Sequence, residues 1–281
     1  MFNKFNYKYN TRPKDTQKPT KPIIAKLLET NIPIQSNRST NKFVYKFKST
    51  YNPVVPLNIF QTWHTKNMLP GMYYNVQFIK RIHPLFTYYL YDDNDCREFI
   101  KNNFEPDVLM AFDTLIPGAY KADLWRYCIL YKMGGIYLDI KFKPTNGFNL
   151  IELTEKEHFV RDVGGVGVYN GVMVCKQGNP LLLRCINKII ENVKNRYYGT
   201  CFLSITGPTL LASMMEQNDK TFVDMHLENP LEDLRIKERQ HLVMYKGICI
   251  LSIYKKYRDE QRKTQKTLPY SVLWHIRQIY I

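Results

Sequence analysis

The chain has 281 residues, of which 44% are hydrophobic, so it is long and apolar enough to bury a full core. Its formal charge of +15 is concentrated: residues 1–50 hold 11 Lys or Arg against 2 Asp or Glu, and residues 254–266 hold 6 against 2. The rest of the chain is therefore close to neutral, and no continuous basic face of the kind that binds nucleic acid is expected. The plainer interpretation is a solvated basic tail, and docking to nucleic acid, membrane phosphates or an anionic glycan is the alternative.

The first 50 residues are polar, basic and interrupted by prolines, which predicts a mostly irregular N-terminal extension ahead of one domain at 51–281. The start of the chain has no apolar run resembling a signal or membrane anchor. We therefore expect a cytoplasmic protein, or one held peripherally at a membrane through its basic N-terminus. The richness in Asn, Lys, Ile and Tyr is typical of AT-rich genomes, including those of large DNA viruses.

Strand-like and helix-like segments alternate in the first half of the domain. The patterns predict strands at 57–63 and 86–91 and helices at 68–82, 95–103 and 107–115. This order predicts an α/β fold: a three-layer sandwich around a mainly parallel central sheet. In such sheets ligands lie beyond the carboxyl ends of the strands.

The most informative segment is a helix followed by two glycines and a short strand. Tyr120–Met133 has good helix formers and no proline, and Gly134 suits the left-handed residue that ends a helix. In the strand, the alternation places Ile136, Leu138 and Ile140 on one face and their neighbours on the other.

If the strand folds back along the helix, four ionisable side chains meet. Arg126 lies roughly 11 Å from the helix end, and Asp139 lies about 13 Å from the glycines. Asp123 and Arg126 are then level with Asp139 and Lys141. The alternative is a helix-surface ion pair beside a solvated strand end.

The second half predicts strands at 159–162 and 166–175, helices at 181–194 and 208–217, and a hairpin at 241–253. The basic stretch 254–266 is interpreted as a mobile loop, and 267–281 as a segment that closes over the site.

These motifs resemble the glycosyltransferase family whose sugar-binding region contains a DXD motif. The family includes initiating α-1,6-mannosyltransferases, capsular polysaccharide transferases and the glucosylating clostridial toxins. The resemblance covers roughly residues 55–215 and is carried by Ala122–Tyr127, Gly134–Lys141 and the Ile-Phe-Gln-Thr-Trp-His run at 59–64. It implies a GT-A-like fold and transfer of a hexose from a nucleotide sugar to a hydroxyl of a glycan or polysaccharide, with retention at the anomeric carbon.

Roles follow position by position from the resemblance. Trp63 would stack on the nucleotide base, and Asp139, the first acid of the motif, would face the donor's hydroxyls. A C-terminal Trp and Ser would close over the diphosphate. The donor-binding set is therefore Gln61, Trp63, Asp123, Arg126, Tyr137, Asp139, Ser271 and Trp274, and the catalytic set is Asp139, Lys141 and Arg126.

The sequence departs from the family at Lys141, which stands where the second acid normally ligates a divalent cation. An ammonium is not a metal ligand. Lys141 either supplies the positive charge itself, so that Mn²⁺ or Mg²⁺ is not needed, or marks a protein that binds donor without efficient transfer. If a cation binds, Asp139 is the expected ligand, with His275 as a weak second.

Two further stretches are candidates for the acceptor side. Asn170 is part of a polar-Asn-Gly stretch that resembles one beside the family's acceptor cleft, and otherwise matches a tight turn. Thr206 and Gly207 resemble a cleft-lining Thr-Gly-Pro, and otherwise form a helix start.

The alternative function is a nucleotide-sugar-binding subunit without turnover. The donor would be a UDP- or GDP-hexose in either case, and nucleic acid is not an expected partner.

Overall fold

The structure, a computed structural model, describes residues 23–24, 48–165, 167–229, 240–265 and 267–281. These residues contain a nine-stranded sheet in the order β4-β3-β5-β8-β7-β9-β10-β11-β6. Its strands are β3 (Asn58–Thr62), β4 (Thr87–Tyr91), β5 (Gly135–Leu138), β6 (Phe142–Pro144), β7 (His158–Arg161), β8 (Val168–Cys175), β9 (Val223–Glu228), β10 (Leu242–Tyr245) and β11 (Ile248–Ile253).

The sheet is mixed in direction. Parallel pairing joins β3 to β4 and to β5, and β7 to β9. The remaining neighbours in the described sheet pair antiparallel. The α/β class is confirmed, but the sheet is not mainly parallel, because hairpins and antiparallel returns replace helical crossovers in much of the second half.

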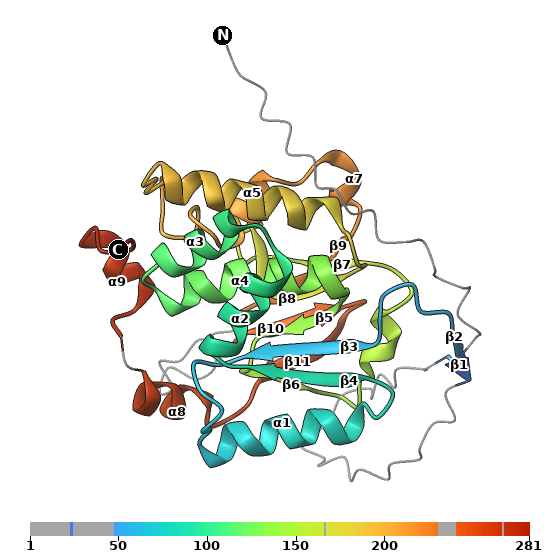
Figure 1. Cartoon of the computed structure of the whole chain (residues 1–281). Helices are drawn as coiled ribbons and strands as arrows, with labels where there is room; N and C mark the ends of the chain where they lie inside the picture. Colours follow the sequence, from blue (N-terminus) through green and yellow to red (C-terminus); the bar gives the residue numbers. More distant parts are fainter. Residues whose placement is uncertain (1–22, 25–47, 166, 230–239, 266) are drawn as a thin grey trace.

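Helices cover both faces of the sheet, which confirms the three layers (Figure 1). One face carries α2 (Asp93–Asn103), α3 (Pro106–Thr114), α4 (Gly118–Met133) and α5 (Pro180–Lys194), and α1 (Pro70–Ile82) packs on the other. The shorter helices are η1 (Leu150–Leu153), α6 (Pro208–Ser213), α7 (Gln217–Lys220), α8 (Tyr257–Thr264) and α9 (Tyr270–His275).

Local chemistry explains where these helices begin. Helices α1, α3, α5 and α6 each begin with a proline. Proline has no backbone N–H, and at the start of a helix that N–H would have no acceptor within the helix. Asp92 caps α2 in a capping box with Asp95, so this acidic run acts as a helix start.

The central strand β5 alternates as predicted. Ile136 and Leu138 pack in the core on the α1 side of the sheet, whereas Tyr137 packs in the core beneath α4. Polar residues that follow Tyr137 are thereby directed towards α4.

The sequence predicted a mobile loop at 254–266, and this prediction is wrong over most of that stretch. Residues 257–264 form α8, in which Tyr257 and Glu260 are buried. The charges of this stretch suggested solvent exposure, but these two residues lie one turn apart and face α1 and the sheet. Strands β6 and β9 were also not predicted.

The proposed N-terminal extension lies mostly outside the described residues. In the part that the structure describes, Ile23–Ile24 (β1) pair antiparallel with Thr50–Tyr51 (β2). None of the described helices is both long and apolar enough to cross a membrane.

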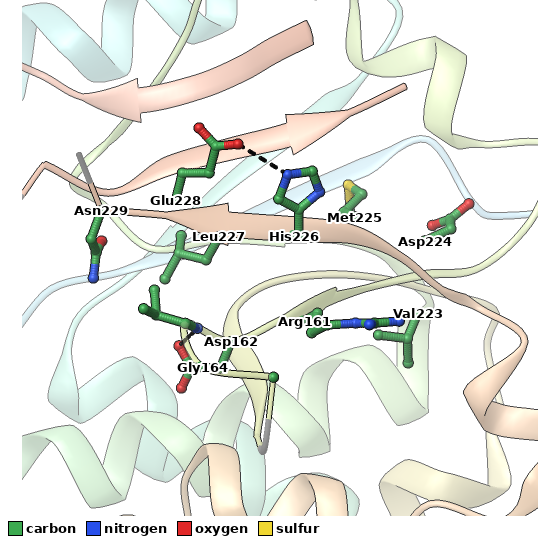
Figure 2. Close-up of a pocket in the computed structure, with 12 residues that line it drawn as sticks. Arg161, Asp162, Gly164, Val223, Asp224, Met225, His226, Leu227, Glu228 and Asn229 are labelled. Carbon is green, nitrogen blue, oxygen red and sulfur yellow. Dashed lines mark hydrogen bonds and ion pairs between the residues drawn. The ribbon is translucent and has the colours of Figure 1, made fainter. Parts of the chain in front are cut away.

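A pocket of about 670 Å³ opens beyond the end of β7, alongside β9 (Figure 2). Arg161 and Asp162 line it from one side, and His226 and Glu228 line it from β9, with His226 Nε2 3.2 Å from Glu228 Oε1.

Candidate functional site

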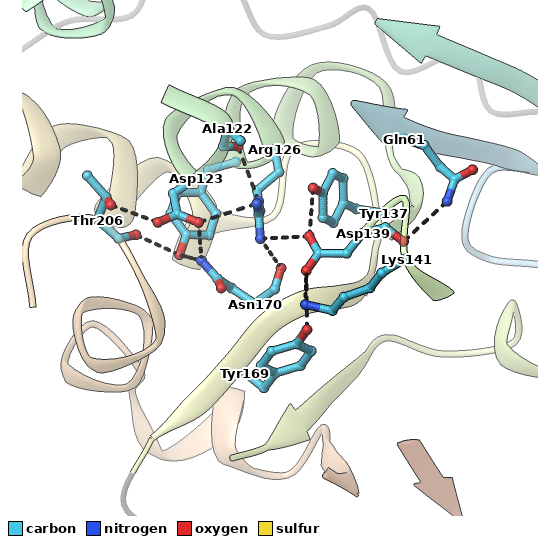
Figure 3. Close-up of polar contacts among 11 residues, drawn as sticks. Gln61, Ala122, Asp123, Arg126, Tyr137, Asp139, Lys141, Tyr169, Asn170 and Thr206 are labelled. Carbon is cyan, nitrogen blue, oxygen red and sulfur yellow. Dashed lines mark hydrogen bonds and ion pairs between the residues drawn. The ribbon is translucent and has the colours of Figure 1, made fainter. Parts of the chain in front are cut away.

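The candidate site forms where α4 turns back into β5. Gly134 ends α4 with a φ of 62°, and a Cβ there would lie 2.6 Å from the backbone nitrogen of Gln177. Only glycine fits this reversal, which brings the end of β5 level with the middle of α4. The predicted meeting of Asp123 and Arg126 with Asp139 is therefore confirmed as geometry (Figure 3).

Four cationic or hydroxyl groups surround the Asp139 carboxylate. Lys141 Nζ donates to Oδ2 at 2.8 Å, and Arg126 Nη1 lies 3.5 Å from Oδ1. The hydroxyl of Tyr137 donates to Oδ1 at 3.0 Å, and that of Tyr169 donates to Oδ2 at 3.2 Å. Burial opposes ionisation of Asp139, but the charges of Lys141 and Arg126 outweigh it and hold its pKa well below the ordinary range. Asp139 is therefore a carboxylate at every physiological pH.

The charges in this cluster are largely withdrawn from solvent. The side chains of Arg126, Lys141 and Asp139 are 7%, 13% and 21% exposed. Arg126 also stacks its guanidinium 4.4 Å from the ring centroid of Tyr137. The more exposed carboxylate of Asp139 is the part of this cluster that a ligand would reach first.

A second carboxylate, Asp123, is held inside the protein. Its Oδ1 accepts from Asn170 Nδ2 at 2.9 Å and lies 3.4 Å from Arg126 Nη2, and its Oδ2 accepts from Thr206 Oγ1 at 2.7 Å. Burial raises the pKa of Asp123, and Arg126, Thr206 and Asn170 oppose that rise. Asp123 thus fixes Arg126, which in turn donates to the carbonyl of Asn170 at 2.9 Å.

The residues predicted for the acceptor side are buried around Asp123 and do not line an open cleft in this structure. Asn170 and Thr206 are buried, and their polar groups bond within the protein. Gly207 is also buried, and a Cβ on it would lie 3.4 Å from Asp123 Oδ2. These three residues are enclosed around Asp123 in this structure, and their contact with an acceptor stays a prediction.

Gln61 is likewise a supporting residue in this structure. It is fully buried, donates to the backbone carbonyl of Asp139 at 3.3 Å, and accepts from the hydroxyl of Tyr88 at 2.6 Å. Gln61 thus holds the backbone of Asp139, and its contact with a donor stays a prediction.

Trp63 lies directly after β3, as predicted, and is partly buried. Its ring is 4.7 Å from that of His64 and meets Tyr257 edge-on at 6.4 Å. The indole N–H is buried and has no hydrogen-bond partner within the described residues. Stacking of Trp63 on a base stays a prediction.

The C-terminal candidates lie on α9, which packs against α4. The indole N–H of Trp274 donates to the carbonyl of Tyr198 at 2.6 Å and its ring faces Phe202, so Trp274 anchors α9. Ser271 is partly buried on the same helix, and His275 is exposed beside Trp274. Contact of Ser271 or Trp274 with a donor stays a prediction.

The chemistry of the donor set does not fit a divalent cation. Two cationic side chains, Lys141 and Arg126, already lie beside the Asp139 carboxylate and would repel a metal ion, and the position two residues on presents an ammonium where a ligand is needed. Within the described ranges, no three His, Cys, Asp or Glu side chains gather in a group that could hold a metal.

The sequence did not predict that Tyr169 contacts Asp139. Strand β8 pairs antiparallel with β5, with Leu138 opposite Val172, and this register brings Tyr169 beside Asp139. A Cβ at Gly171 would lie 2.6 Å from Asp139 Oδ2, so a larger residue there would displace this carboxylate or the Tyr169 hydroxyl. The Tyr-Asn-Gly run was visible in the sequence, but its register against β5 was not.

We expect Arg126→Met to destabilise the fold strongly. The change leaves Asp123 buried without its cationic partner and removes a neighbour of Asp139. Loss of one member of a buried ion pair costs about 3–5 kcal/mol. Denaturant unfolding measures this cost. Arg97→Met is the control, because the Arg97–Asp113 pair at 2.7 Å is exposed and screened by water, so its loss should lower stability little. Equal losses for the two variants would contradict the structural role of Arg126.

Comparisons with known proteins agree with the motif. Residues 71–158 match the family described as "Glycosyltransferase sugar-binding region containing DXD motif". The chain is 34% identical over 171 residues to inositol phosphoceramide mannosyltransferase 3 of Schizosaccharomyces pombe, covering 60% of this chain and 47% of that protein. It is 31% identical over 204 residues to inositol phosphoceramide mannosyltransferase 2 of the same yeast, covering 69% and 58%.

A viral protein is also similar. An uncharacterized glycosyltransferase of Acanthamoeba polyphaga mimivirus is 50% identical over 50 residues, covering 18% of this chain and 20% of that protein. The chain spans about half the length of the two yeast relatives. The family match spans α4 and β5, so the part of the chain that carries Asp123, Arg126 and Asp139 is similar to the glycosyltransferase family whose sugar-binding region contains a DXD motif.

Proposed function

We propose that this protein is a glycosyltransferase that moves a hexose from a UDP- or GDP-sugar to a hydroxyl acceptor, with retention at the anomeric carbon. The observation that carries the proposal is the convergence of Asp123, Arg126 and Asp139 at the end of the central strand. Since two of the most similar relatives are named mannosyltransferases, mannose is the hexose to test first.

In this proposal Asp139 binds hydroxyls of the donor. Its carboxylate keeps its charge because Lys141 and Arg126 lie beside it. A carboxylate accepts strong hydrogen bonds from sugar hydroxyls, and a fixed one holds the donor in one orientation. Arg126 and Asp123 hold Asp139 at the required place.

Lys141 is proposed to stabilise the departing diphosphate. Negative charge builds on the leaving group as the bond to the sugar breaks, and a preorganised positive group lowers that barrier. Asp139-Ile140-Lys141 is then a variant of the DXD motif in which an ammonium stands where relatives carry the second acid. Lys141 is 13% exposed, so its charge is poorly screened by water.

The acceptor is proposed to approach from the pocket beyond β7. Asp162 lines this pocket, burial raises the pKa of Asp162, and the charge of Lys141 partly opposes that rise. Arg161, which lines the pocket, pairs with Val168 across β7 and β8, next to Tyr169, whose hydroxyl contacts Asp139. This register supports a pocket that adjoins the donor side of the site.

A panel of nucleotide sugars, screened with and without manganese, tests the proposal. We expect one UDP- or GDP-sugar to raise the melting temperature and to be consumed when an acceptor is supplied, because a ligand that binds only the folded state stabilises it. Activity should survive EDTA. Complete loss in EDTA that manganese restores would refute the role of Lys141.

A second possible result is that the protein binds a nucleotide sugar but does not consume it. It would favour the alternative of a nucleotide-sugar-binding subunit without turnover. A protein that binds none of the panel would contradict both functions.

A further inference from the structure

The buried carboxylate of Glu260, on α8, caps the N-terminus of α1. Glu260 Oε1 accepts the N–H of Gly71 at 2.6 Å, and Oε2 accepts the N–H of Met72 at 2.8 Å. These N–H groups have no partners inside α1, and the helix dipole favours negative charge there. The contact joins parts of the chain 188 and 189 residues apart.

The contact is closely fitted. Glu260 is 7% exposed, and its Oε2 also accepts from the hydroxyl of Tyr254 at 2.9 Å. A Cβ on Gly71 would lie 2.6 Å from Glu260 Oε1. Three donors offset the cost of burying the carboxylate, and Gly71 leaves the space that it occupies.

This contact holds α8 beside the residues proposed to bind the donor. The backbone N–H of Tyr254 donates to the carbonyl of Lys141 at 3.0 Å. Tyr257 is buried in the same hydrophobic cluster as Ile140, the residue between Asp139 and Lys141, and meets Trp63 edge-on at 6.4 Å. Figure 1 shows α8 beside the beginning of α1, at the same end of the sheet as the end of β3.

We propose that Glu260 is a positioning residue that sets the affinity for the nucleoside diphosphate part of the donor by docking α8 on α1. The inference rests on the proposed function, because Trp63 and Lys141 meet a nucleotide only if the donor is a nucleotide sugar. Glu260 acts through Tyr257, which fixes the position of Trp63, and through Tyr254, which fixes the backbone of Lys141.

Glu260→Gln tests the inference, since it keeps the shape but presents an amide NH₂ to backbone donors. We expect the dissociation constant of UDP or GDP to rise about tenfold, the loss expected for a charged hydrogen-bonded contact. The donor KM should rise while kcat at saturating donor changes little. Amides of α8 should also lose protection from hydrogen exchange. Asp259→Asn is the control: it removes the same charge from an exposed position on α8, and none of these measurements should change.

Gly71→Ala tests the same contact from the other side and serves if Glu260→Gln does not fold. Its Cβ should displace the carboxylate, weaken nucleotide binding and lower the hydrogen-exchange protection of α8. In the double variant the effects of the two substitutions should not add. Wild-type nucleotide affinity in both single variants would overturn the inference. If the wild-type protein binds neither UDP nor GDP, the transferase proposal fails and the effect on the donor fails with it. Hydrogen exchange of α8 then decides on its own whether Glu260 docks this helix.

Discussion

Asp139→Asn should reduce sugar transfer by on the order of a thousandfold or more while leaving a folded protein. The change removes the negative charge that two cations and two tyrosine hydroxyls hold in place. An amide accepts weaker hydrogen bonds and also turns a donor towards Lys141 or Tyr137. Initial rates at saturating donor measure the loss, and thermal unfolding checks that the fold remains.

Asp113→Asn is the matched control for this experiment. Asp113 is also a carboxylate hydrogen-bonded to an arginine, but it lies half exposed on the surface of the domain. Its loss should leave the rate within a few fold of the parent. Turnover of Asp139→Asn close to that of Asp113→Asn would remove Asp139 from the catalytic machinery.

Lys141→Asp should lower activity in the absence of metal by roughly a hundredfold or more, the effect of losing a preorganised group at a developing anion. The variant places a second carboxylate two residues from Asp139 and rebuilds an Asp-x-Asp pair. Carboxylates are the ligands that hard divalent cations prefer. We therefore expect added manganese to restore part of the lost rate, measured as a titration of rate against Mn²⁺ in EDTA-treated protein.

Lys143→Asp is the control for Lys141→Asp, because it makes the same change of charge two residues further on. Lys143 is exposed on β6, where its ammonium lies over the ring of Phe78 at 4.8 Å. Its substitution should alter neither the rate nor the response to manganese. A Lys141→Asp protein indistinguishable from the parent, with and without manganese, would show that the lysine has no role in transfer.

The local signals in the sequence predicted much of the fold. The order of elements from β3 to β5 follows from apolar periodicity and from Gly134 at the end of α4. The side-chain alternation in β5 and the return of the strand along α4 follow from the same short-range rules. These rules act within about twenty residues, and they were sufficient to bring Asp123, Arg126 and Asp139 together.

Contacts between distant segments decided the rest. Asn170, Thr206 and Gly207 were expected to line a cleft, but the register of β8 and the start of α6 enclose them around Asp123. Tyr169 reaches Asp139 through the same register.

The basic stretch at 254–266 shows the limit of composition most clearly. Its charges predicted a mobile loop, yet α8 is docked by Glu260 on the N-terminus of α1. The sequence determined the helix-and-strand unit that carries Asp123, Arg126 and Asp139, because its geometry depends on neighbours along the chain. Only the tertiary structure decided what surrounds that unit, because burial of a polar side chain depends on partners that lie up to 189 residues away.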